Sequence, residues 1–203
     1  MDQEKVWDSI AGRWNKFRTR TAPSVEEFVS GRKGRILDVG CGSGRNFVKS
    51  GGLEWSAVDF SANMVGFAKE KAGKLGMDVD IEKADSTELP FDDGSFDCIL
   101  CVAVLHCVDS EAKRKKTLRE IGRVLRDGGE ALIMAWGRNS PKVKGKGREC
   151  FIPWKIKNLK ERQMRYTYVF ELDELVGLCE SVGLEVVRAW EEMNVNVVVR
   201  KLG

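Results

Sequence analysis

Short apolar runs alternate with longer amphipathic stretches along most of this chain. An apolar run predicts a strand buried on both faces, and apolar positions at helical spacing predict a helix that covers such a strand. The two final strands are joined by a short connection, which implies an antiparallel pair. The expected strands are residues 35–39, 55–59, 79–83, 96–104, 131–136, 184–189 and 195–200, and the expected helices are 62–75, 110–125 and 173–182, with a short helix through Phe47. This alternation predicts an α/β fold, with a seven-stranded, mostly parallel sheet and helices on both faces.

Local signals mark several boundaries of these elements. Ser61 is placed to cap the helix at 62–75, and Gly128 with Gly129 is expected to terminate the helix at 110–125. Residues 3–30 predict two helical pieces that are broken near Pro23, while glycine and lysine make residues 137–150 a loop. With 203 residues we expect one domain, 1–203, with a helical segment at 1–31 and a basic insertion at 137–170.

The most informative motif follows the first expected strand. Residues 36–46 read ILDVGCGSGRN, with glycines at 40, 42 and 44 that let the backbone turn sharply and approach a ligand closely. Asp59 ends the next strand, nineteen residues after Gly40, where a carboxylate can accept hydrogen bonds from both hydroxyls of a ribose. Strand, turn and acid together favour a nucleoside ligand over an ordinary glycine turn.

Charge indicates which nucleoside this motif would bind. A dinucleotide fingerprint spaces its glycines G-x-G-x-x-G, but Arg45 stands where the third glycine would be. Asp38 directly precedes the turn, where its charge would repel a phosphate. A ligand with an ammonium and a sulfonium group, such as S-adenosylmethionine, suits this position better.

The six cysteines do not predict a metal site. Cys98 and Cys101 form C-x-x-C, but they fall within an expected strand, in which residues i and i+3 point to opposite faces. We interpret them as core residues in a reducing compartment. The sequence has no visible signal peptide or membrane span, and we therefore expect a cytoplasmic protein without metal.

Basic residues are concentrated in one stretch of the chain. Residues 138–165 hold ten Lys or Arg against two Glu, whereas the remainder holds 24 basic and 29 acidic residues. A basic segment on an otherwise acidic domain is typical of a protein that binds a polyanion. The alternative is a solvated loop kept soluble by its charge.

These motifs resemble the class I S-adenosylmethionine-dependent methyltransferases over nearly the whole chain. ILDVGCGSG resembles their first motif, Asp59 their ribose acid, Asp85 in KADSTELPF their adenine-binding acid, and FDCILCVAVLHCV the motif that lines the methyl-transfer pocket. The resemblance implies the Rossmann-like strand order 3-2-1-4-5-7-6. The cofactor-binding residues that it implies are Asp38, Gly40, Gly42, Gly44, Asp59, Phe60, Met64, Asp85, Ser86 and Val102.

A narrower resemblance lies in the segments that vary among methyltransferases. WDSIAGRWNKFR, AVLHCVDS, ALIMAWGRN, ECFIPWK and RYTYVF are similar to a tRNA-modifying branch that includes the methyltransferase domain of a human AlkB homologue. That branch methylates the carboxylate of 5-carboxymethyluridine at the wobble position. It usually has two consecutive histidines where this chain has His106 and Cys107.

This second resemblance implies roles on the substrate side. Arg18, with Arg20 as the alternative, would hold the carboxylate by a bidentate fork, and His106 would orient the substrate beside the cofactor's methyl end. A carboxylate is already ionised at neutral pH, so no general base is required. The further residues expected to bind RNA are Trp154, Arg165, Tyr166, Lys142, Lys144 and Lys146, with Phe151 as a further stacking candidate.

The partners expected for the chain are the anticodon loop of tRNA and, by resemblance, a small zinc-binding activator protein that adds a strand to the sheet edge. Neither DNA nor a membrane is an expected partner. Two other functions stay open. One is a small-molecule methyltransferase of the same fold, which has little use for a strongly basic loop. The other is a non-catalytic subunit that binds cofactor or RNA without transferring a methyl group.

Overall fold

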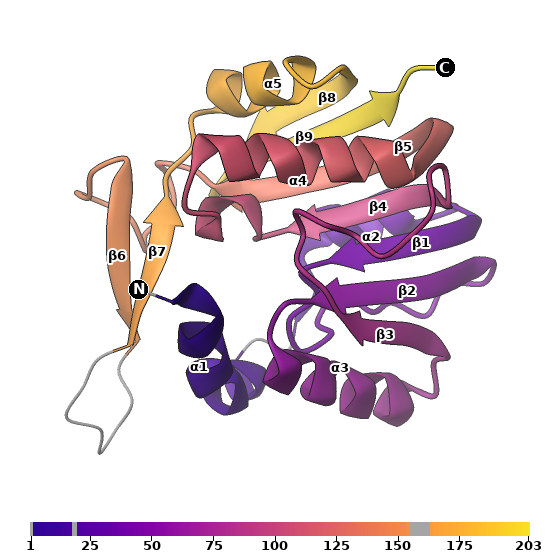
Figure 1. The fold of residues 1–203 in the computed structure, drawn as a ribbon, viewed down its shortest axis with the longest axis horizontal. Helices are drawn as coiled ribbons and strands as arrows, with labels where there is room; N and C mark the ends of the chain where they lie inside the picture. The colour runs from indigo at the N-terminus through magenta and orange to yellow at the C-terminus, as the bar shows by residue number, and fades with distance from the viewer. Residues whose placement is uncertain (1, 18–19, 155–162) are drawn as a thin grey trace.

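A seven-stranded sheet forms the centre of the computed structural model, which describes residues 2–17, 20–154 and 163–203 (Figure 1). Its strand order is β3-β2-β1-β4-β5-β9-β8, and β9 pairs antiparallel with both β5 and β8, whereas the other neighbouring strands pair parallel. This confirms the predicted fold class and strand order. The strands are β1 (Gly34–Val39), β2 (Leu53–Asp59), β3 (Val79–Lys83), β4 (Phe96–Val102), β5 (Leu125–Trp136), β8 (Leu184–Glu191) and β9 (Asn194–Lys201).

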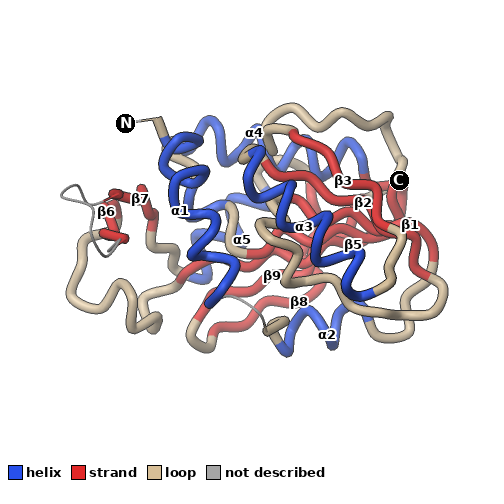
Figure 2. Tube along the Cα trace, turned by 90° about the horizontal axis from the view of Figure 1, so that it is seen from below, coloured by secondary structure: helices blue, strands red, loops and turns tan. Residues whose placement is uncertain are grey.

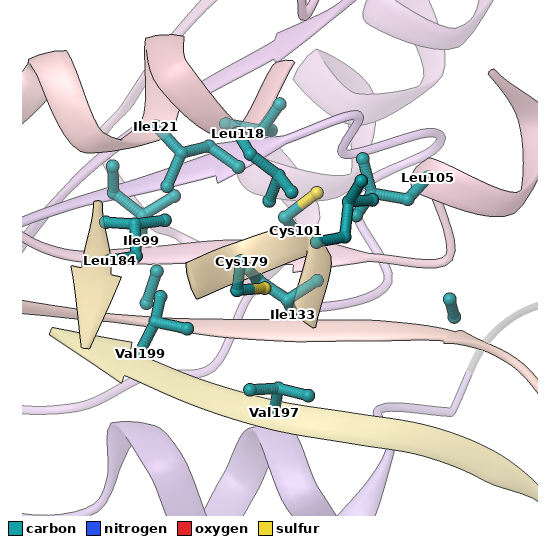
Figure 3. Close-up of a cluster of buried hydrophobic side chains, with 14 of the residues drawn as sticks. Ile99, Cys101, Leu105, Leu118, Ile121, Ile133, Cys179, Leu184, Val197 and Val199 are labelled. Atoms are coloured by element: carbon teal, nitrogen blue, oxygen red, sulfur yellow. The ribbon is translucent and has the colours of Figure 1, made fainter. Parts of the chain in front are cut away.

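Helices cover both faces of this sheet. Helices α2 (Pro23–Val29) and α3 (Ala62–Leu75) bury one face, and α4 (Glu111–Val124) and α5 (Leu172–Glu180) bury the other. Figure 3 shows the second core, where Leu118 and Ile121 of α4 meet Ile99 and Ile133 of the sheet. Cys98 belongs to the first core and Cys101 to the second, as expected for opposite faces of one strand.

Two elements lie outside this layered body. Helix α1 (Gln3–Phe17) lies between α3 and a separate antiparallel hairpin, β6 (Glu149–Trp154) and β7 (Gln163–Tyr168) (Figures 1 and 2). Both sit beyond the carboxyl ends of the parallel strands. They therefore cover the edge of the sheet at which open α/β folds bind their ligands.

The structure corrects three of the predicted elements. The segment after β1 is a series of turns without a helix, because its glycines adopt positive φ angles that end each turn. Helix α4 ends at Val124, and Gly128 and Gly129 lie within β5. Strand β4 stops at Val102, since Ala103 has a φ of +65°. Outside these segments, the helix at 62–75 and the strand at 79–83 match their predicted bounds.

Within the described residues, no helix is both long and apolar enough to cross a membrane.

Candidate active site

The glycine turn after β1 forms one side of a cavity at the carboxyl ends of the central strands. Gly40 has a φ of +69°, and a Cβ added there would lie 2.3 Å from Cγ2 of Val104, so only glycine fits. Gly42 lines the cavity with a φ of +55°, and its nearest neighbour across the space is Nε1 of Trp14, 3.8 Å from an added Cβ. Gly44 is buried against the core, where an added Cβ would be too close to Phe47.

The cavity collects residues from strand ends that are far apart in sequence. Helix α1 covers it from the hairpin side, while the turns after β1, β2, β3 and β4 form its floor and sides. The lining residues are Gln3, Trp7, Trp14, Gly40, Cys41, Gly42, Ser43, Arg45, Asn46, Asp59, Phe60, Met64, Ala84, Asp85, Ser86, Thr87, Val102, Ala103, Val104, Cys107, Val108, Asp109 and Lys113. Most of the residues predicted to bind the cofactor are thus brought together; Asp38 and Gly44 lie behind the turn.

Asp59 is held in place at the end of β2 by two backbone amides. Its Oδ2 accepts from the N–H of Gly42 at 2.9 Å, and its Oδ1 accepts from the N–H of Ser61 at 3.0 Å. Burial raises the pKa of the Asp59 carboxyl to about 6, although both hydrogen bonds favour its ionised form. Each oxygen keeps a second lone pair, so the carboxylate can still accept from ligand hydroxyls.

Asp38 lies behind the turn and is completely buried at the end of β1. Both of its oxygens accept from Nδ2 of Asn46 at 3.2 Å. Burial raises the pKa of the Asp38 carboxyl to about 7, although the hydrogen bond from Asn46 and the charge of Arg45 both favour its ionised form. A positively charged ligand in the cavity would stabilise the ionised form.

Asp85 occupies the opposite end of the cavity, after β3. Its Oδ1 accepts from the backbone N–H and the hydroxyl of Thr87 at 2.8 and 2.9 Å, which fixes the turn. Ser86 lies within hydrogen-bond distance of Thr117 on α4, at 3.1 Å between the hydroxyl oxygens. This end therefore presents fixed backbone and an acid, as the family resemblance implies for the adenine site.

His106 follows β4 but does not line the cavity in the described structure. It is 3% exposed, its ring stacks on Trp136 with centroids 4.6 Å apart, and its Nδ1 accepts from the backbone N–H of Trp136 at 3.3 Å. Its neighbours Val104 and Cys107 line the cavity instead. The expected position of His106 beside the methyl group is therefore not seen, because the 3-10 turn at 105–107 directs its ring into the protein.

Arg165 of β7 lies among the rings of four tryptophans. Its guanidinium carbon is 5.2 to 5.9 Å from the centroids of Trp7, Trp14, Trp136 and Trp154, and the residue is 6% exposed. These distances suit cation–π attraction. Two of the tryptophans also line the cavity, so the guanidinium lies directly behind its α1 side.

Tyr166 points away from this tryptophan cluster, because consecutive strand residues face opposite sides. Its ring is buried in the core beside α4 and packs edge-on against Phe151, which is half exposed. Trp154 is partly buried and packs on Trp14 at 5.5 Å. As placed, Tyr166 and Trp154 are packing residues, whereas Phe151 has an accessible ring.

The remaining predicted residues lie on the surface or outside the described residues. Lys142, Lys144 and Lys146 are exposed on the loop between β5 and β6. Arg20 is exposed just before α2, and Arg18 lies outside the described residues.

The residues of the cavity fit S-adenosylmethionine. Asp59 offers ribose acceptors, and the Gly42 turn leaves open space where any side chain would intrude. Oδ1 of Asn46 is buried at the cavity without a hydrogen-bond donor in the described part of the chain, and a ligand ammonium could supply one. When bound, this cofactor supplies a methyl group on a sulfonium, and an in-line nucleophile takes the methyl group while the thioether sulfur leaves.

The chain is similar in sequence to known methyltransferases. The family described as "Methyltransferase domain" matches residues 37–133. A protein of Encephalitozoon cuniculi, whose name gives only the methyltransferase class, is 29% identical over 97% of this chain and 94% of its own. The tRNA (carboxymethyluridine(34)-5-O)-methyltransferase of Xenopus tropicalis is 32% identical over 71% of this chain, which spans only 22% of that relative.

A solved structure extends the comparison to the whole fold. A methyltransferase in complex with a methyltransferase activator of Haloferax volcanii matches 100% of this chain and 97% of its own, with a TM-score of 0.72 and 18% identity. The fold is that of the class I S-adenosylmethionine-dependent methyltransferases, residues 37–133 match a methyltransferase domain, and both support S-adenosylmethionine as the cofactor. The named relatives of the chain include tRNA carboxymethyluridine methyltransferases.

Sequence reasoning missed the contribution of α1 to the cavity. Gln3, Trp7 and Trp14 all line it. Trp7 and Trp14 are seven residues apart, so helical spacing places them on one face, but periodicity does not show what such a face covers. The asparagine at 46 was likewise missed, although its place in the glycine motif could have drawn attention to it.

Proposed function

We propose that this enzyme methylates the carboxylate of 5-carboxymethyluridine, or a related 5-substituted uridine, at the wobble position of tRNA. The observation that carries the proposal is the buried guanidinium of Arg165, set among tryptophans behind the cavity. A cation there compensates the negative charge of a carboxylate brought up to the methyl group. Arg165 does not itself line the cavity, so it would act on the carboxylate through its charge, while Trp7 and Trp14 limit where the carboxylate can lie.

The chemistry at this end of the cavity requires no general base. A carboxylate is ionised at neutral pH and is itself the nucleophile. Cys107 lines the cavity, and burial raises the pKa of its thiol to about 12 although the charge of Arg165 favours the thiolate. The thiol therefore stays protonated and does not compete for the methyl group. Orientation and exclusion of water by the tryptophans would account for catalysis.

RNA as the carrier of this carboxylate is supported by charge and by the relatives. Lys142, Lys144 and Lys146 form an exposed basic loop on the hairpin side of the cavity, where phosphates of an anticodon stem could bind. The Xenopus relative is named for this reaction on tRNA. His106 and Trp136 would support the wall of the pocket, with Arg18 or Arg20 as further carboxylate-holding candidates.

A partner protein is part of this proposal. The Haloferax volcanii methyltransferase is bound to an activator. In the present chain β3 is an edge strand of the sheet, and an edge strand presents unpaired backbone groups to which another chain can add a strand. We infer that a small zinc-binding activator pairs there.

The test compares two preparations of one tRNA, with and without 5-carboxymethyluridine, using labelled cofactor in the presence and absence of activator. Label should enter the modified tRNA only. Arg165→Met should lower kcat/KM by roughly ten- to a hundred-fold, the scale of a charge–charge attraction across several ångströms inside a protein, while leaving cofactor affinity unchanged. Equal labelling of both tRNAs would contradict the carboxylate target, and labelling of small carboxylic acids alone would favour the small-molecule alternative.

A further inference from the structure

Gln3, at the start of α1, bonds to the backbone on both sides of Arg165. Its Oε1 accepts from the N–H of Tyr166 at 2.9 Å, and its Nε2 donates to the carbonyl oxygen of Met164 at 3.4 Å. The same side chain lines the cofactor cavity. One carboxamide thus contacts the cavity and the strand that carries the buried guanidinium.

These two bonds imitate a strand pairing. In an extended strand, the carbonyl of one residue and the N–H of the residue two positions later point to the same edge. The other edge of β7 pairs with β6, where Arg165 lies opposite Ile152. The Gln3 carboxamide therefore satisfies two backbone groups that flank Arg165 and limits how far this part of β7 can move from α1.

Helix α1 is in turn fixed to the cofactor side of the cavity. Asp8 accepts from the hydroxyl of Ser61 at 2.5 Å and from the backbone N–H of Asn63 at 3.1 Å, at the start of α3. Ser61 itself donates its N–H to Asp59. A continuous set of contacts thus runs from the ribose acid through α1 to β7.

We propose that Gln3 is a positioning residue, which holds Arg165 at a fixed place relative to the bound cofactor. The proposal rests on the proposed function in one respect, that the charge of Arg165 attracts the substrate carboxylate. Gln3 itself touches the cavity and the strand, and it acts on methyl transfer through Arg165. Without the carboxamide, β7 would move relative to the cavity and transfer would slow although the cofactor still binds.

The test uses Gln3→Met, which keeps the length and apolar packing of the side chain but removes both hydrogen bonds. Lys5→Met is the matched control, since Lys5 is exposed on the same helix. Hydrogen exchange of the Tyr166 amide is measured with S-adenosylhomocysteine bound. Exchange should be about ten-fold faster in Gln3→Met and unchanged in the control, the scale of one lost hydrogen bond.

Kinetics then separate positioning from simple stability. In Gln3→Met, kcat should fall by up to about a hundred-fold, the cost of a displaced catalytic group, with affinity for S-adenosylhomocysteine unchanged. Gln3→Glu keeps the acceptor for the Tyr166 amide. Exchange of that amide should therefore stay slow, and kcat should lie between the values of the wild-type enzyme and Gln3→Met. Wild-type exchange in Gln3→Met, or fast exchange with wild-type kcat, would overturn the proposal. If the wild-type enzyme does not methylate the modified tRNA, the proposed function fails, but the exchange result still decides whether Gln3 holds β7.

Discussion

At the scale of single residues, two buried carboxyl groups define the charge of the cofactor site. Asp38 and Asp59 both have raised pKa values, about 7 and about 6, because burial disfavours their ionised forms. Their type and spacing could be predicted from sequence, since they follow two strands of a parallel sheet. The inward ring of His106 could not, because only tertiary packing places it against Trp136.

A pH dependence of cofactor binding follows from these carboxyl groups. Below pH 7 the free protein increasingly protonates Asp38, whereas a ligand with positive charge requires the ionised form. Binding must then release a proton, so the Kd for S-adenosylmethionine should rise by up to about ten-fold for each pH unit below 7. Isothermal titration calorimetry between pH 5.5 and 8 measures this Kd. Asp38→Asn should lose this part of the dependence, and a flat profile in the wild-type protein would refute the assignment.

At the scale of elements, local sequence signals predicted where a helix begins and ends better than they predicted which other elements it packs against. Helix α3 begins behind its cap, where the hydroxyl of Ser61 accepts from the N–H of Met64, and ends at Gly76, whose φ is +59°. The β6–β7 hairpin was missed, because Pro153 interrupts β6 and a proline within an apolar run argues against a strand. The covering role of α1 was missed for a different reason, since it depends on Asp8 and Gln3 reaching elements distant in sequence.

The exposed loop between β5 and β6 makes a testable contribution to RNA binding. Replacing Lys142, Lys144 and Lys146 by Gln should weaken tRNA binding and reduce the slope of log affinity against log salt by up to about one for each lost phosphate contact. Cofactor affinity should not change.

A control triple variant at Lys33, Lys49 and Lys74 removes the same charge from positions near the amino ends of the strands, at the opposite edge of the sheet. Equal effects of the two variants would show that net charge alone matters. An unchanged slope in the loop variant would mean that the loop is only solvated.

At the scale of the whole molecule, the sheet order places the cavity at the carboxyl ends of the adjacent parallel strands β1 and β4. The strand order of the sheet reverses here, because β1 is followed by β2 on one side and β4 by β5 on the other, and the loops that leave in opposite directions form a crevice. Helix α1 and the hairpin lie beyond this end of the sheet (Figure 1). They bring Trp7, Trp14 and Trp154 together around the buried guanidinium of Arg165. The general fold thus supplies the cofactor site, and the two added elements would supply the substrate specificity.

The most direct test of the central claim identifies the atom that receives the methyl group. Modified tRNA is labelled with enzyme, activator and cofactor carrying a radioactive methyl group, and the product is treated with mild alkali. A methyl ester hydrolyses under these conditions, so the account predicts that the label is released as volatile methanol. Label that stays on the nucleoside after this treatment would mean transfer to a ring or ribose atom, and would contradict a mechanism in which a carboxylate is the nucleophile.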